Sequence, residues 1–164
     1  MRTLPLSRGL VALVDDEDYA LASKYKWSLR VNGGGNRYAT HTFGDKPVLL
    51  HRFIMEAPWD SAIDHINGDG LDCRRSNLRF ATHVQNMGNR AKPKVGFGGL
   101  PPTSRYKGVS LARRRRGRLV WHLRIEHAGT VFQRDFKTER EAALAYNAKA
   151  LEFWGAYARL NEVS

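Results

Sequence analysis

Residues 63–86 read IDHINGDGLDCRRSNLRFATHVQN, and this stretch decides how the N-terminal half of the chain folds. Residues 63–66 are typical of the end of a strand, and Asn-Gly-Asp-Gly at 67–70 predicts a turn or loop because these residues tolerate positive φ. Leu-Arg-Phe-Ala at 78–81 predicts the returning strand. Thr-x-x-Gln at 82–85 predicts a capping box that begins a short helix. The stretch therefore predicts a strand, a long loop, a strand and a helix.

Four polar residues are spaced along this pattern so that they can meet. Asp64 and His65 end the first strand, Asn86 lies on the first turns of the helix, and Asn77 lies in the loop, where its amide can bind backbone. An imidazole suits a general base because its ordinary pKa is about 6.5. Carboxylate and amide oxygens suit a hard cation. The spacing predicts metal-assisted cutting of DNA.

The segments HRFIM (51–55) and IDHINGDGLDCRRSNLRFATHVQNMGN (63–89) resemble the HNH endonuclease family. The similarity is to the branch that is common in bacteriophage genomes and related to intron-encoded homing and nicking enzymes. It covers residues 1–92 and implies an HNH ββα-metal nuclease domain there.

By position, the resemblance makes His65 the general base and Asn77 the residue that orients it. Asp64 and Asn86 would then hold one divalent metal ion, magnesium or manganese. The implied products of cleavage carry a 5′ phosphate and a 3′ hydroxyl.

The charge of the chain favours a polyanionic partner. There are 27 Lys and Arg against 16 Asp and Glu, a formal net charge of +11. Basic proteins also bind membrane surfaces, so the distribution of charge matters more. Residues 1–92 carry 13 cations and 10 acids, a net of +3, whereas residues 93–164 carry 14 and 6, a net of +8. The C-terminal half is therefore expected to be the stronger electrostatic anchor for double-stranded DNA.

The cysteine count and the lack of long apolar segments limit the class of protein. A single cysteine, Cys73, excludes an intramolecular disulfide and any zinc site built from several cysteines. No secretory segment and no apolar run of membrane-spanning length are seen, so a cytoplasmic protein is expected. The resemblance implies that the cell is the bacterial host of a phage or mobile element. The sequence has no heptad pattern that would indicate a protein partner, so we expect a monomer.

A Gly- and Pro-rich segment divides the chain. Residues 90–104 contain three glycines and three prolines, a composition unfavourable for a helix or a central strand. We expect an α+β protein with a nuclease domain at 1–92, a linker at 93–103 and a second domain at 104–164. In the first domain, the acids at 15–18 predict the start of a helix, because they complement its positive end.

The second domain shows strands followed by a helix. Residues 106–112, 119–126 and 130–136 predict a small three-stranded antiparallel sheet. A capping box at Thr138-x-x-Glu141 predicts a helix that ends near Gly155. Helical spacing predicts that one helix face packs on the sheet, and we assign to it Ala143, Leu144, Ala150, Leu151 and Trp154.

The motifs Tyr106-x-Gly108-Val109, Phe136-x-Thr138, EAALAY at 141–146 and Leu160-Asn161 resemble the ethylene-response-factor (apetala-two type) DNA-binding domain of plants, which is also appended to HNH enzymes. The resemblance spans residues 104–161. It implies that the sheet lies in the major groove and that its exposed side chains contact DNA.

Candidate DNA contacts come from both halves. On the nuclease side, His51 could contact phosphate or be a buried structural residue, and Arg75 could contact phosphate or lie in a solvated loop. The alternation of Leu78, Arg79 and Phe80 favours Arg79 as an outward contact. The full set of candidates is His51, Arg52, Arg75, Arg79, Lys107, Arg113, Arg114, Arg115, Arg116, Arg118, Arg124 and Phe132.

Two functions fit the sequence. The first is a metal-dependent nicking or double-strand endonuclease of homing type, whose C-terminal domain chooses the site. The second is a non-catalytic, sequence-specific DNA-binding regulator. The joint presence of the metal pair and the base favours the enzyme.

Overall fold

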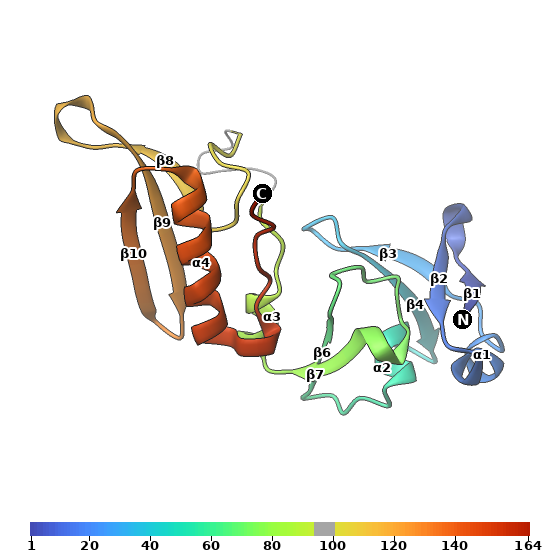
Figure 1. Cartoon of the computed structure of the whole chain (residues 1–164). Helices are drawn as coiled ribbons and strands as arrows, with labels where there is room; N and C mark the ends of the chain where they lie inside the picture. Colours follow the sequence, from blue (N-terminus) through green and yellow to red (C-terminus); the bar gives the residue numbers. More distant parts are fainter. Residues whose placement is uncertain (94–100) are drawn as a thin grey trace. The chain divides into compact units, whose positions relative to one another are not determined.

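The computed structural model describes residues 1–93 and 101–164, and the chain divides into two compact units, Met1–Asn86 and Met87–Ser164. Both units mix small antiparallel sheets with a few helices, in agreement with the expected mixture of α and β structure (Figure 1). Most of the predicted linker, residues 94–100, lies outside the described residues. In the part of the chain that the structure describes, no helix is both long and apolar enough to cross a membrane.

Small sheets and short helices make up the N-terminal unit. In its described residues β1 pairs with β2, β3, β4 and β5 form a second sheet, and β6 pairs with β7, all antiparallel. The strands are β1 (Arg2–Pro5), β2 (Val11–Val14), β3 (Ser28–Val31), β4 (Arg37–Phe43), β5 (Lys46–Leu49), β6 (Ala62–His65) and β7 (Leu78–Ala81). The helices are α1 (Asp16–Ala22), α2 (Leu50–Ile54) and α3 (His83–Gly88), with 3-10 helices at Ser7–Gly9 and Arg75–Asn77.

One apolar core holds this unit together. It takes inward-facing residues from β1, β2, α2, β6 and β7, including Leu4, Val14, Leu50 and Leu78. Cys73 from the loop between β6 and β7 is also part of this core and is fully buried. The loop that carries the candidate site is therefore anchored by apolar packing and not by its polar residues alone.

In the C-terminal unit, an antiparallel sheet packs on one long helix (Figure 1). The sheet order is β10-β9-β8, from β8 (Val109–Arg113), β9 (Leu119–His127) and β10 (Thr130–Phe136). The helix is α4 (Glu139–Trp154), and 3-10 helices lie at Arg115–Gly117 and Gly155–Tyr157. The bounds of β10 match the prediction. β8 begins later than predicted, at Val109, because the φ of +73° at Gly108 is not compatible with extended backbone.

Helix α4 begins as predicted but turns a different face to the sheet. The Thr138 hydroxyl accepts a hydrogen bond from the Glu141 amide at 3.2 Å, and the Glu141 carboxylate accepts one from the Thr138 amide at 3.1 Å. The buried face consists of Ala142, Ala143, Tyr146, Ala150 and Trp154. The assignment of Leu144 and Leu151 to this face was wrong, since they are 45% and 50% exposed. They lie seven residues apart and so share a different side of the helix.

Gly108 is expected to be far more sensitive to substitution than a glycine of similar backbone. A Cβ at Gly108 would overlap the Tyr146 ring, and its φ is +73°, whereas Gly117 has a φ of +76° with open space around it. Gly117→Ala should therefore cost only the strain of a positive φ, about 1 kcal/mol. Gly108→Ala adds a clash in the core and should cost about 3 kcal/mol or more. Chemical denaturation of both variants checks this, and equal losses would contradict it.

Candidate nuclease site

Strands β6 and β7 and helix α3 form the predicted strand-loop-strand-helix unit. Residues of β6 and β7 pair so that Asp64 lies opposite Arg79 and His65 opposite Leu78. The capping box before α3 is present: the Thr82 amide donates to Gln85 Oε1 at 2.8 Å, and the Gln85 amide donates to Thr82 Oγ1 at 3.1 Å. Local sequence signals therefore place the candidate ligands on β6 and α3.

The loop between β6 and β7 is pinned at several points. The Leu13 amide of β2 donates to Leu71 O at 2.8 Å, and the Cys73 amide donates to Leu13 O at 2.9 Å. Asp72, which is 2% exposed, binds the Arg74 guanidinium at 2.6–2.7 Å and accepts a hydrogen bond from Asn67. These contacts hold the loop to the rest of the unit.

Asn77 crosses this loop with its side-chain amide. Its Nδ2 donates to Asp72 O at 2.8 Å, and its Oδ1 accepts from the Asn67 amide at 3.0 Å. Its backbone oxygen accepts from the Ile66 amide at 2.9 Å, directly after His65. Asn77 is only 7% exposed, so these bonds are shielded from water. The side chain thus fixes two points of the loop that follows the candidate base, in line with the bridging role that its residue type suggested.

His65 lies against a second histidine in the interior. His65 and His51 are each 6% exposed, and their ring centroids are 4.7 Å apart at 89°. Burial lowers the pKa of His65 from 6.5, although Asp64, Asp69 and Asp72 act in the opposite direction. Burial, with a smaller contribution from His65, lowers the pKa of His51 to about 3. Both rings are therefore neutral at neutral pH, the form in which His65 can accept a proton.

The second histidine, His51, had two possible roles in the sequence: a phosphate contact or a buried structural residue. Of the two interpretations of His51, the structure favours the buried structural residue over an exposed phosphate contact. Tyr38 of β4 completes the aromatic surroundings, with its ring 5.8 Å from that of His51 and 6.0 Å from that of His65. Tyr38 also lies against Gly70, where a Cβ would meet its ring at 2.7 Å. Nothing in the sequence indicated Tyr38, because it lies far from the motif along the chain.

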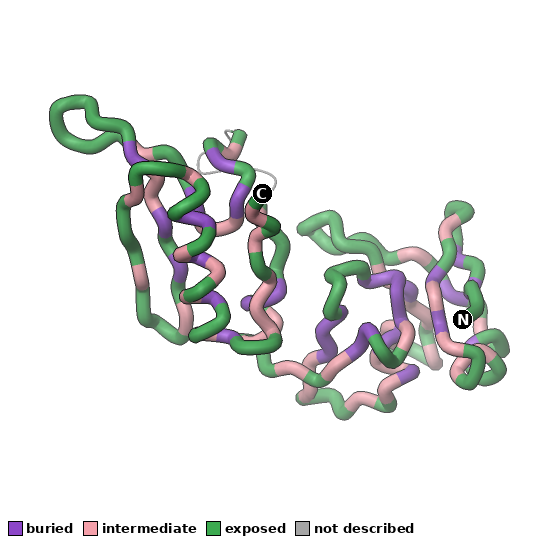
Figure 2. Tube along the Cα trace, viewed as in Figure 1, coloured by how far each residue is buried: buried purple, intermediate pink, exposed green. Residues whose placement is uncertain are grey.

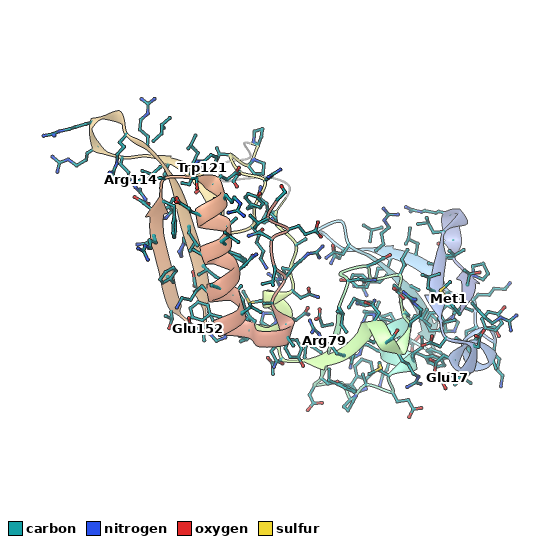
Figure 3. All side chains as sticks on the ribbon, viewed as in Figure 1. Met1, Glu17, Arg79, Arg114, Trp121 and Glu152 are labelled. Atoms are coloured by element: carbon teal, nitrogen blue, oxygen red, sulfur yellow. The ribbon has the colours of Figure 1, made fainter. Side chains whose placement is uncertain are left out.

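Asp64 is bound to a cation from the opposite strand. Arg79 Nε donates to Asp64 Oδ2 at 2.8 Å, and Arg79 Nη2 lies 2.7 Å from the same oxygen. The Asp64 side chain is 4% exposed and that of Arg79 18%, so the pair is shielded. The predicted alternation was wrong, since Phe80 is the residue that is 47% exposed and Arg79 faces Asp64 instead (Arg79 in Figure 3).

The residues present fit a hard divalent cation. Asp64 is a buried carboxylate that already binds positive charge, and Asn86, partly buried on α3, brings an amide oxygen. Among the described residues no three His, Cys, Asp or Glu side chains form a metal-binding group. Oxygen donors of this kind are what magnesium prefers, and magnesium keeps several waters and binds through few protein ligands.

Two further arginines proposed as DNA contacts make structural bonds. Arg52 donates to the backbone oxygens of Ala57, Pro58 and Ser61 and so closes the loop after α2. Arg75 binds Asp18 through Nε and Nη2 at 2.7–3.2 Å and also donates to Ile54 O.

The acidic run at 15–18 begins a helix, as predicted, and also binds charged groups elsewhere. Asp15 makes no side-chain cap bond; its carboxylate accepts from the Arg75 amide at 2.8 Å. Asp16 binds the N-terminal ammonium at 2.6 Å. The run thus anchors the segment that leads into Asn77.

In the C-terminal unit, Lys107 and Phe132 do not lie on the open face of the sheet. Half-buried Lys107 donates from Nζ to Gly88 O at 2.7 Å. Phe132 pairs with Ile125 of the core and packs on the α4 side, with Lys149 Nζ 4.8 Å from its ring centroid. Paired residues of neighbouring strands share a face, so Phe132 faces the helix. The structure therefore corrects its assignment as a DNA-facing residue.

The arginines between β8 and β9 remain exposed. Figure 2 shows this hairpin tip as exposed, and side chains point outward from it in Figure 3. Arg114 is exposed too but is the one held in place, because it binds Asp135 at 2.6–2.8 Å and contacts His122. Exposed Arg124 makes a surface ion pair with Glu126 at 2.7 Å. The remaining arginines of the tip are Arg113, Arg115, Arg116 and Arg118, all exposed.

The buried histidines predict acid destabilisation. An unfolded chain protonates His51 below about 6.5, whereas in the folded chain its pKa is about 3. The unfolded state therefore gains protons first, and the free energy of unfolding should fall by about 1 kcal/mol per pH unit as pH drops below 6. His51→Phe should lose less stability over this range than wild type. His83→Phe changes an exposed residue of α3 and should behave like wild type. Denaturation at pH 6 and 5 checks this; identical slopes for all three would contradict it.

Comparison with known proteins agrees with this geometry. Residues 48–88 match the model of a family described as HNH endonuclease, and they span α2, β6, β7 and α3. The chain is also similar to an uncharacterized HNH endonuclease of Acanthamoeba polyphaga mimivirus, with 29% identity over 163 residues, 95% of this chain and 77% of that protein. No solved structure matches.

Residues 48–88 therefore form an HNH endonuclease domain. The family match and the viral relative together support nuclease activity, which is a hydrolase reaction.

Proposed function

We propose that the chain is a metal-dependent DNA endonuclease of homing type, with His65 as general base. The observation that carries the proposal is the buried, neutral His65 next to Asp64, in a loop that Asn77 braces through two side-chain hydrogen bonds. A structural histidine needs neither an adjacent carboxylate nor a braced loop. A general base needs its ring in the neutral form and in a fixed position.

Hydrolysis of a phosphodiester follows from these roles. A ring nitrogen of His65 takes a proton from water as the water oxygen forms a bond to phosphorus. The bond from phosphorus to the 3′ oxygen breaks, and that oxygen gains a proton from solvent. The products are a 5′ phosphate and a 3′ hydroxyl. Asn77 acts as a positioning residue, because it holds backbone on both sides of the loop after His65.

Asp64 and Asn86 are the residues proposed to hold one divalent metal ion, magnesium or manganese. When bound, such an ion supplies positive charge to the phosphate and the departing oxygen. Arg79 balances the charge of Asp64 in the structure. A buried carboxylate needs such a partner, because an isolated charge is costly away from water.

The C-terminal unit is proposed to choose the DNA site as an ethylene-response-factor-like domain. Support comes from the net charge of +8 over residues 93–164 and from the exposed arginines of the β8–β9 tip. Exposed Arg124 lies in the middle of β9, where its neighbours Leu123 and Ile125 face the core, so it faces away from α4. Arginines on an exposed tip suit phosphate contacts, and side chains on the sheet suit base contacts.

End mapping tests the proposal. Purified protein is incubated with end-labelled duplex DNA of random sequence and magnesium or manganese, and the new ends are sequenced and tested for ligation. We expect ligatable 5′ phosphate and 3′ hydroxyl ends clustered at related sequences. Sites on one strand would indicate nicking, and paired sites would indicate double-strand cutting. Specific binding without new ends would instead favour a non-catalytic regulator.

A further inference from the structure

A cavity of about 400 Å³ opens in the C-terminal unit, away from the residues of the open sheet face. Its walls come from the segment after α3, from the residues that precede β8, and from the C-terminal tail. In Figure 1 the tail and the segment after α3 lie side by side, and the Arg159 amide donates to Gly88 O at 3.2 Å. Its charged lining residues are Lys92, Arg105, Lys107, Arg159 and Glu162.

Hydrogen bonds fix the walls of this cavity. Asn161 accepts from the Lys107 amide at 2.7 Å and donates to Lys107 O at 3.2 Å. Asn147 of α4 holds the backbone of Asn161 from both sides, at 2.7 and 2.9 Å. The tail is thus tied to α4 and to the residue before Gly108. The cavity has a preformed shape and is not a gap between loose segments.

The charge of the cavity is strongly unbalanced. It has four cationic side chains and one acid, and within the described residues none of the four cations makes an ion pair. Lys92 and Lys107 donate to the backbone oxygens of Ser104 and Gly88. Arg105 donates to the hydroxyls of Tyr106 and Ser164. These partners are neutral, so the positive charge is not cancelled.

The ionisation of Lys107 reflects this excess charge. Burial, with smaller contributions from the positive charges of Arg159 and Arg90, lowers the pKa of Lys107 to about 8. An anion bound in the cavity would offset the repulsion that Arg159 and Arg90 exert on the Lys107 ammonium. Four cations that converge beside a single carboxylate, that of Glu162, leave an excess of positive charge, which is what phosphate recognition uses.

We propose that this cavity binds a phosphate group, supplied by the backbone of nucleic acid. Lys92, Arg105 and Arg159 contact the phosphate oxygens, and Lys107 adds charge from the inner wall. The site lies outside the HNH domain and contains no residue of the β8–β9 tip. It therefore deepens the DNA binding proposed for the C-terminal unit and is separate from the cutting chemistry. The proposal that nucleic acid supplies the phosphate rests on the proposed DNA binding by the chain. The affinity of the cavity for phosphate does not.

The test uses the full chain with a chelator, so that cutting plays no part. The double variant Lys92→Gln, Arg159→Gln removes two charges from the cavity and keeps Lys107 in place. The matched control, Lys137→Gln, Arg140→Gln, removes two exposed charges from the same unit outside the cavity. Arg159→Gln alone is the milder variant, because no side-chain bond of Arg159 is seen in the described residues. Circular dichroism and melting confirm that each variant is folded.

Two titrations are made with each protein. Duplex binding is measured against salt, and melting temperature is measured against inorganic phosphate and pyrophosphate at constant ionic strength. We expect the cavity variant to bind duplex about ten-fold more weakly and its salt slope to drop by about 0.9, the value for one phosphate contact. The control should change little.

The outcomes separate the sources of phosphate. Saturable stabilisation by pyrophosphate in wild type but not in the cavity variant, with unchanged duplex binding, supports the site and identifies free phosphate as its source. This result holds even if the chain cuts no DNA. Equal losses of duplex binding in the cavity variant and the control, with no stabilisation by phosphate or pyrophosphate, would overturn the proposal.

Discussion

His65→Ala is expected to reduce DNA cutting by about 10²–10⁴-fold, the usual contribution of a general base. The residue has a buried, neutral ring beside Asp64, and its removal leaves the attacking water with no base. DNA affinity, measured with a chelator, should stay unchanged, because the side chain is only 6% exposed and carries no charge. Single-turnover cleavage at saturating protein separates the rate from binding.

His83→Ala is the matched control for this experiment. His83 lies exposed at the start of α3, in the same domain but away from the buried pair. Its loss should leave the cutting rate close to that of wild type. A His65→Ala protein that cuts as fast as His83→Ala would remove the base assignment.

Asp64→Asn is expected to abolish metal-supported cutting through loss of metal affinity. The substitution keeps the shape and one oxygen donor but removes the charge that attracts a divalent ion. Arg79 would also lose its charged partner in a shielded place, and we expect a loss of stability of about 3 kcal/mol from the unpaired guanidinium. Titration calorimetry with manganese reports the metal affinity directly, independently of cutting.

Asp60→Asn serves as the control, because Asp60 is exposed in the loop before β6. It should bind manganese and cut DNA as wild type does. Unchanged manganese affinity in Asp64→Asn would contradict the ligand assignment, even if cutting were lost. A variant that unfolds is recognised by its melting curve, and Asp64→Glu then tests whether restoring the charge recovers metal binding.

Local signals in the sequence predicted the elements of the site well. Both capping boxes act over four residues, so the starts of α3 and α4 could be recognised without tertiary information. The Asn-Gly-Asp-Gly segment predicted the loop for the same reason. Asn77 was assigned to bridge this loop, and its hydrogen bonds to Asp72 and Asn67 confirm that geometry.

Long-range pairing explains what the sequence did not reveal. Arg75 is held by Asp18, 57 residues earlier, and no local pattern marks that distance. Arg79 was expected to face outward because of its alternation with Leu78 and Phe80, whereas its cross-strand partner Asp64 binds it. Phe132 was assigned by resemblance, whereas pairing with Ile125 determines which face of β10 it occupies.

The α4 error has a different cause. Alanines are abundant on several sides of the helix, so hydrophobic spacing alone did not distinguish Leu144 from Ala142. Burial of Tyr146 and Trp154 against the sheet decides the orientation, because large aromatic residues contribute most to packing. Alanine, which fits on either side of a helix, gave little information.

Relaxation of supercoiled plasmid by the purified chain tests the central claim most directly. Reactions contain magnesium, manganese or a chelator and are compared at equal ionic strength. The account predicts relaxed circles or linear DNA with either metal and intact supercoiled DNA with the chelator. Supercoiled DNA that stays intact with both metals, or equal cutting with the chelator present, would contradict a metal-dependent HNH nuclease.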